Sequence, residues 1–89
     1  MTDPVFLRFI DIAESCGLNE KQADECGEDC VQIILNNYDE MTNKYDENEI
    51  IRIMTEDYKF DFLKDKRDEV SELIKEEIKI YRHDMGYED

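Results

Sequence analysis

The apolar residues near the N-terminus recur three or four positions apart, which is the spacing of one face of a helix. Asp3 followed by Pro4 is typical of a helix start, and Gly17 is typical of a helix end. The pattern therefore predicts a first helix over residues 4–16. Its expected apolar stripe consists of Val5, Phe6, Phe9, Ile10, Ala13 and Cys16.

A second helical segment is expected to begin at Asn19, which forms a capping-box sequence with Gln22. Gly27 then leaves two alternatives open. Either the helix continues through this glycine at a cost of about 1 kcal/mol relative to alanine, or one helix over 19–26 is followed by another over 29–42. A Cys-Gly pair ends both this segment and the first helix, which favours the stop. In both alternatives the apolar stripe reaches about residue 42.

A third helix is expected after Asp46, which precedes Glu49 in another capping-box sequence. Residues 58–62 alternate between apolar and polar side chains, as a strand does. A hairpin of residues 50–54 with 58–62 is thus an alternative, although we favour a helix or bend. The apolar positions beyond this segment predict a long last helix over 62–85.

Taken together, these patterns predict an all-α fold, a small bundle of four or five helices, with a short β-hairpin near 50–62 as an alternative. The length of 89 residues fits a single helical domain over 1–89. No apolar run approaches the ~20 residues of a membrane span, and the N-terminus does not resemble a signal peptide. The odd number of cysteines argues against a disulfide framework, so we expect a cytoplasmic protein.

The net charge of the chain limits the kinds of partner that it is expected to bind. The chain has 25 acidic and 11 basic residues, which gives a net charge of −14. Proteins that bind nucleic acids or anionic membranes need Lys and Arg to neutralise phosphates. We therefore expect neither direct nucleic acid binding nor membrane binding, and a basic protein surface becomes the favoured partner. The residue usage is also compatible with AT-rich coding, as in many bacteria and phages.

The acidic residues are not distributed evenly. In the last helix Glu72 precedes Lys75 and Glu76 precedes Lys79, so opposite charges meet on one face. Residues 22–43 contain no Lys or Arg, and like charges four positions apart cost a few tenths of a kcal/mol per pair. This segment is either a surface under no pressure to balance its charge or a docking face for a basic partner. The acids of the predicted face are Asp24, Glu25, Glu28, Asp29, Asp39 and Glu40.

Residues that bear chemistry form no specific motif. Cys16, Cys26 and Cys30, with His83, allow a zinc site in principle, but the short Cys-x2-Cys hairpin is missing and cysteine is commonly a core residue. No segment supplies the glycine and glutamate of a calcium loop, and neither serine lies in a nucleophile motif. The sequence thus predicts no catalytic residue, no metal and no cofactor.

The favoured interpretation is a non-enzymatic, protein-binding module. It would dock its acidic face on a basic partner, and a sharper form is an inhibitor that mimics nucleic acid. A first alternative is a self-associating protein, a homo-oligomer with a structural or small-ligand-binding role, because some apolar residues lie off the main stripes. A second is a small metal-binding protein that uses the three cysteines. The surplus apolar residues are Leu7, Ile12, Leu35, Ile51 and Ile80.

Overall fold

The computed structural model describes residues 3–87 and begins with two antiparallel helices, α1 (Pro4–Ser15) and α2 (Glu20–Asn36). The side chain of Asp3 accepts a hydrogen bond of 2.8 Å from the backbone N–H of Val5, which starts α1 as the sequence predicts. Gly17, at φ +98°, ends the helix in a Schellman motif, in which the N–H of Leu18 donates to the carbonyl of Ala13. The following capping box is complete, because Asn19 and Gln22 each accept the other's backbone N–H.

α2 runs through Gly27 without a break, so of the two alternatives the continuous helix is confirmed, and the stop that the repeated Cys-Gly pair favoured is wrong. Gly27 is buried where α2 crosses α1, and a Cβ built on it would lie 2.9 Å from Cδ1 of Phe6 and 3.2 Å from Cγ1 of Ile10. The glycine therefore permits a close approach of two helices and does not end one. The Cys-Gly pair at 26–27 resembles the one at 16–17 in sequence only.

A two-stranded hairpin, β1 (Tyr38–Asp39) with β2 (Lys44–Tyr45), follows α2. The prediction that the helix reaches residue 42 is thus wrong. The side chain of Asn37 donates to the carbonyl of Ile33 at the helix end. Tyr38 then pairs with Tyr45 across the strands. A left-handed residue in the turn, Asn43 at φ +56°, lets the chain reverse.

The alternative hairpin over 50–62 is also wrong, because this segment is mostly helical. α3 (Glu47–Arg52) starts at Asp46 and passes into a π-helical turn over Ile53–Asp57. The hydroxyl of Thr55 donates to the carbonyl of Ile51 at 2.9 Å, a contact that widens or bends helices. The buried apolar residues of this segment recur at helical spacing. The alternation of apolar and polar residues at 58–62 gives no sign of that helical pattern.

The segment predicted as one long last helix over 62–85 forms two elements in the structure. A 3-10 turn over Asp61–Lys66 leads into α4 (Arg67–Asp84). Gly86, at φ +85°, follows the end of α4 in a second Schellman motif, with the N–H of Tyr87 donating to the carbonyl of Arg82.

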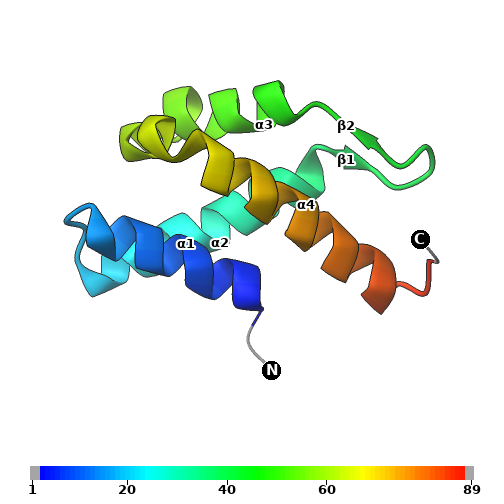
Figure 1. Ribbon diagram of the computed structural model, residues 1–89, viewed down its shortest axis with the longest axis horizontal. Coiled ribbons are helices and arrows are strands. Elements are labelled where there is room, and N and C mark those ends of the chain that lie inside the picture. The colour runs from blue at the N-terminus through cyan, green and yellow to red at the C-terminus, as the bar shows by residue number, and fades with distance from the viewer. Residues whose placement is uncertain (1–2, 88–89) are drawn as a thin grey trace.

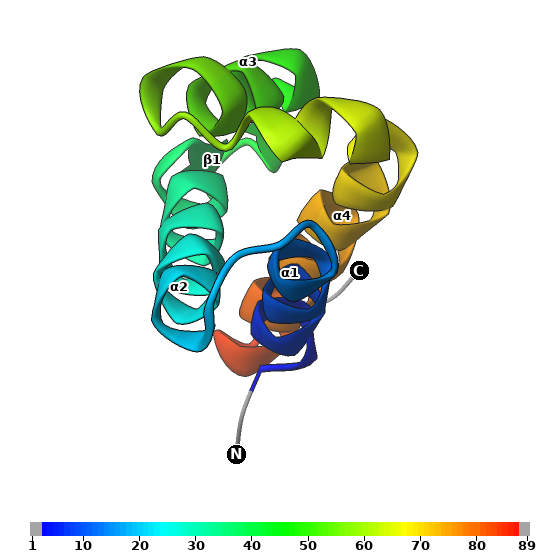
Figure 2. The same ribbon diagram turned by 90° about the vertical axis from the view of Figure 1, so that its left-hand side faces the viewer.

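The helices enclose one apolar core, and the all-α fold class is confirmed. Figure 1 shows α4 crossing in front of α2, with α1 beside α2 and the β-hairpin near the C-terminal half of α4. Seen from the end, α1 lies between α2 and α4, while α3 and the turns over residues 53–66 close the opposite side (Figure 2). The largest fully buried side chains come from every helix and include Phe9, Ile34, Ile50, Met54, Leu63 and Ile74.

Most of the surplus apolar residues also serve this core. Ile12 and Ile51 are 6% and 2% exposed. Leu35 and Ile80 are half-buried, and Leu7 alone of this set is largely exposed, at 48%. The surface that motivated the self-association alternative is therefore mostly covered within one chain. None of the helices in the described range 3–87 is long and apolar enough to cross a membrane.

Candidate functional site

Four of the predicted site residues lie together on α2. Asp24, Glu25 and Glu28 are exposed, and Asp29 is half-buried. Because the helix is continuous through Gly27, Asp24 and Glu28 lie one turn apart on one line, and Glu25 and Asp29 lie on the next. We call these four residues the α2 acidic face.

The α2 acidic face forms no ion pair within residues 3–87. Within residues 3–87, the ion pairs join other parts of the chain, such as Arg8 with Glu69 at 3.9 Å and Lys75 with Glu72 at 3.8 Å. Lys21 is the only basic residue of α2, and it forms no ion pair with the face. The like-charge pairs on α2 are therefore left uncompensated in the folded chain.

Asp29 differs from its neighbours because it lies partly inside the surface. Burial raises the pKa of its carboxyl, and the charge of Glu25 raises it further. Both effects disfavour the charged form of the Asp29 carboxyl. A cation brought to Asp29 from outside would favour that charged form.

Asp39 and Glu40 do not belong to this face, because the chain leaves α2 before them and enters the hairpin. Asp39 accepts the backbone N–H of Met41 at 3.0 Å and so orders the turn. Glu40 accepts a hydrogen bond of 2.7 Å from the hydroxyl of Tyr81 on α4. This bond, with burial, raises the pKa of Tyr81. Asp39 thus orders the turn of the hairpin, and Glu40 joins the hairpin to α4.

Two cavities flank the α2 acidic face, and Asp29 lines both. One, of about 360 Å³, lies toward α1 and is lined by Phe6 and Glu28. The other, of about 430 Å³, lies toward the segment after the π-helical turn and is lined by Glu25 and by three aromatic rings. These rings belong to Tyr58, Phe60 and Phe62.

The aromatic wall was not predicted from the sequence. Residues 58–62 alternate in polarity, and the strand alternative would have put the three rings on one side of a sheet. Instead Lys59 adopts a left-handed conformation at φ +65°, and the N–H of Phe60 donates to the carbonyl of Met54 at 3.1 Å. The rings follow one another with centroids 6.1 Å apart in each successive pair. The aromatic spacing was the available signal, but the side it faces depends on the tertiary fold.

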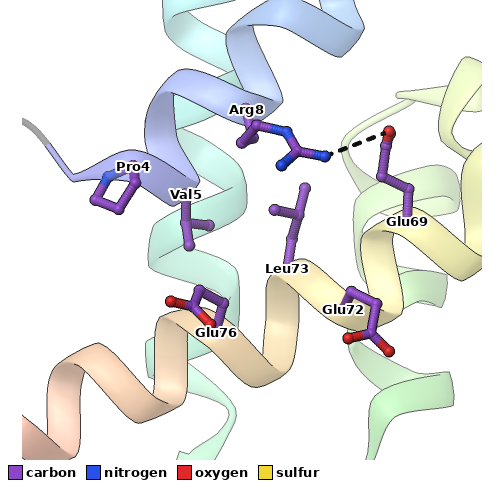
Figure 3. Close-up of a pocket in the computed structure, with 7 residues that line it drawn as sticks. All are labelled: Pro4, Val5, Arg8, Glu69, Glu72, Leu73 and Glu76. Atoms are coloured by element: carbon purple, nitrogen blue, oxygen red, sulfur yellow. Dashed lines mark ion pairs between the residues drawn. The ribbon is translucent and has the colours of Figure 1, made fainter.

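A third cavity, of about 360 Å³, lies between α1 and α4. Figure 3 shows Arg8 reaching across it to Glu69, above the apolar side chains of Val5 and Leu73. Glu72 also lines this cavity and is paired with Lys75. Two of the acids that line this cavity already have cations nearby. A basic partner would therefore gain less here than at the α2 acidic face.

The cysteines are not brought together as one site. Cys16 is exposed at the end of α1, whereas Cys26 and Cys30 are buried, with their Sγ atoms 3.9 Å apart. The hydrogen bond with Cys26 and the burial of the group raise the pKa of Cys30, which disfavours the thiolate that metals and electrophiles require. His83 is exposed. No three His, Cys, Asp or Glu side chains cluster as a metal site anywhere in residues 3–87.

A buried carboxyl on α4 is the most perturbed acid. Glu77 is 3% exposed, and its Oε1 has no hydrogen-bond partner. Burial first, and then a hydrogen bond with the carboxyl of Asp3, raise its pKa to about 9. The sequence interpretation placed either Glu77 or Ile78 on the core stripe, and the structure buries both. Glu77 lies between helices and not on the α2 acidic face.

Comparison with known proteins gives no relative. No protein-family model, no curated protein and no solved structure matches this chain.

Proposed function

We propose that the protein is a small, non-enzymatic binding module that docks the α2 acidic face on a basic surface of another protein. The observation that carries the proposal is that four acids stand one turn apart on α2 while none of them forms an ion pair within the described part of the chain. On α4, by contrast, Glu69 and Glu72 each have a cation nearby, so an external cation gains more at α2 than there. Complementary charge of this kind raises association rates and specificity.

The geometry of α2 supports a rigid docking element. The helix holds Asp24 and Glu28 about 6 Å apart along its axis, since the rise is 1.5 Å per residue. Glu20 continues the same line one turn earlier and is also exposed. The main chain that carries these acids is fixed by the capping box at one end and by close packing on α1 at Gly27. Little backbone freedom therefore remains to be lost on binding, which favours affinity.

The sharper form of the proposal is an inhibitor that occupies a nucleic-acid-binding surface. A line of carboxylates on a rigid helix presents a regular negative field, as a phosphate backbone does. In this form, duplex DNA competes with the protein for the same partner. Partner binding that DNA does not displace would restrict the function to ordinary protein recognition.

Affinity capture from a nuclease-treated lysate of the source cells tests the proposal when two charge-matched variants are compared. The first variant, Asp24→Asn with Glu28→Gln, neutralises the α2 acidic face. The second, Glu72→Gln with Glu76→Gln, removes the same charge from exposed positions of α4. We expect a basic protein that is captured by the parent chain and by the α4 variant, is released by high salt, and is lost with the α2 variant.

The comparison separates a specific face from net charge, because both variants lose two negative charges. Equal loss of the captured protein from both variants would show that total charge, and not α2, carries binding. Retention of the protein at high salt by all three chains would contradict an electrostatic interface.

A further inference from the structure

We infer that the cavity between α2 and residues 58–62 receives the guanidinium group of an arginine side chain presented by the basic partner. The inference rests on the proposed function and names the chemical group that this part of the surface recognises. In this cavity of about 430 Å³ the α2 acidic face adjoins three aromatic rings, of which Tyr58 is 46% exposed.

The two walls of this cavity have complementary chemistry. Glu25 and Asp29 supply carboxylates from α2, while Tyr58, Phe60 and Phe62 supply ring surface from the opposite side. A cation gains from the carboxylates by charge-assisted hydrogen bonds and from ring faces by cation–π attraction. An apolar ligand would leave the carboxylates unpaired, and an anion would be repelled by them.

Arginine fits this combination better than lysine does. Its guanidinium is planar and weakly hydrated, stacks on aromatic rings, and still presents N–H donors at its edge to a carboxylate. Lysine offers a compact, strongly hydrated charge that loses more hydration against the rings. The cavity therefore selects arginine among the basic side chains of a partner.

Two of the three rings are held by the core. Tyr58 is 46% exposed, whereas Phe60 and Phe62 are half-buried and pack against the core. All three rings keep some surface open to a ligand in the cavity. Asp29 is partly buried without an ion-pair partner, and burial raises its pKa. An incoming cation therefore gains further, because it favours the charged form of this carboxyl.

Lys59 is the one basic residue that lines the cavity. It is exposed, and it forms no ion pair with Glu25 or Asp29. Its ammonium group lowers the negative potential that an arginine would meet. Replacing it by a neutral residue that tolerates positive φ, as in Lys59→Asn, should strengthen arginine binding several-fold.

Nuclear magnetic resonance titration of the full chain tests the inference. The probes are two capped peptides that are identical except that one carries arginines where the other carries lysines, each separated by glycine and serine. We expect amide shifts at residues 22–29 and 58–62, and a several-fold tighter dissociation constant for the arginine peptide. Tyr58→Leu, which keeps an apolar side chain at an exposed position, should abolish the preference for arginine.

The charged wall is tested by Glu25→Gln with Asp29→Asn, which should weaken both peptides about tenfold. The matched control is Glu72→Gln with Glu76→Gln on α4, which should change the affinity for either peptide little. Thermal unfolding of each variant confirms that the fold is retained.

Two results would overturn the inference. Shifts confined to the line of Asp24 and Glu28, with equal affinity for both peptides, would leave the proposed docking function intact but remove the arginine cavity. Absence of binding by both peptides would reject the cavity regardless of the capture result, which separately decides the proposed function.

Discussion

Glu77 is a carboxyl group in a position where the helical pattern calls for an apolar side chain. It is buried between α4 and the start of α1, and its neighbours Asp3 and Asp84 are also acidic. The folded chain therefore keeps this carboxyl protonated at neutral pH, whereas the unfolded chain ionises it. Folding takes up a proton at this site, which links stability to pH.

The sign of the linkage follows from the raised pKa. The stabilising contribution is fully present below the ordinary value of 4.5 and is lost as the pH rises toward about 9. We expect Glu77→Gln to remove this dependence, so that its stability relative to the parent chain increases by up to about 1.4 kcal/mol per pH unit in that range. Urea unfolding at several pH values measures the difference.

Glu76→Gln is the control for Glu77, because Glu76 is exposed one residue away. Its stability difference from the parent chain should change little over the same range. A parallel pH dependence for the parent chain and Glu77→Gln would show that this carboxyl is not the group responsible.

At the level of secondary structure, the sequence predicts helix starts better than helix ends. Asp3, Asn19 and Asp46 cap their helices with nearby backbone N–H groups, so the signal is local and the predictions are confirmed. The outcome at Gly27 depends instead on Phe6, and the hairpin at 38–45 depends on contacts with α4. Such distant partners leave no local pattern, so the course of the helix at Gly27 stayed open and the prediction that the helix reaches residue 42 was wrong.

Gly27 gives an element-scale prediction that opposes helix propensity. Alanine is favoured over glycine within a helix by about 1 kcal/mol. Its Cβ would nevertheless lie 2.9 Å from the ring of Phe6. Because overpacking typically costs 1–3 kcal/mol, we expect Gly27→Ala to lower the free energy of unfolding by about 1 kcal/mol net.

A double-mutant cycle with Phe6→Leu checks the cause. In the Phe6→Leu background the smaller side chain removes the contact, so Gly27→Ala should become neutral or stabilising. Stabilisation by Gly27→Ala in the parent chain would show that the two helices do not approach as closely as the structure has them.

At the scale of the whole molecule, sequence reasoning found only part of the candidate site. Asp24, Glu25, Glu28 and Asp29 share an exposed helical face, as their spacing predicts. The aromatic wall was missed because its position is set by the left-handed conformation at Lys59 and by packing on the core. Charge along a helix can be read from spacing, whereas a wall contributed by a distant turn requires the fold.

The unpaired charges also predict a conflict between stability and binding. We expect Asp24→Asn with Glu28→Gln to raise the free energy of unfolding by about 0.6 kcal/mol at low ionic strength, because the like-charge pairs Glu20–Asp24 and Asp24–Glu28 are both removed. The gain should vanish at high salt. Urea unfolding at two salt concentrations measures it, and a loss of stability at low salt would show that these carboxylates have stabilising partners.

The measurement that tests the docking proposal most directly is calorimetric titration of the captured basic protein with the two charge-matched variants. We predict that the α2 variant, Asp24→Asn with Glu28→Gln, binds at least about tenfold more weakly than the parent chain at low salt. The α4 variant, Glu72→Gln with Glu76→Gln, should stay within about twofold, as expected for exposed charges outside an interface. Equal dissociation constants for the two variants would contradict the proposal that the α2 acidic face is the docking surface.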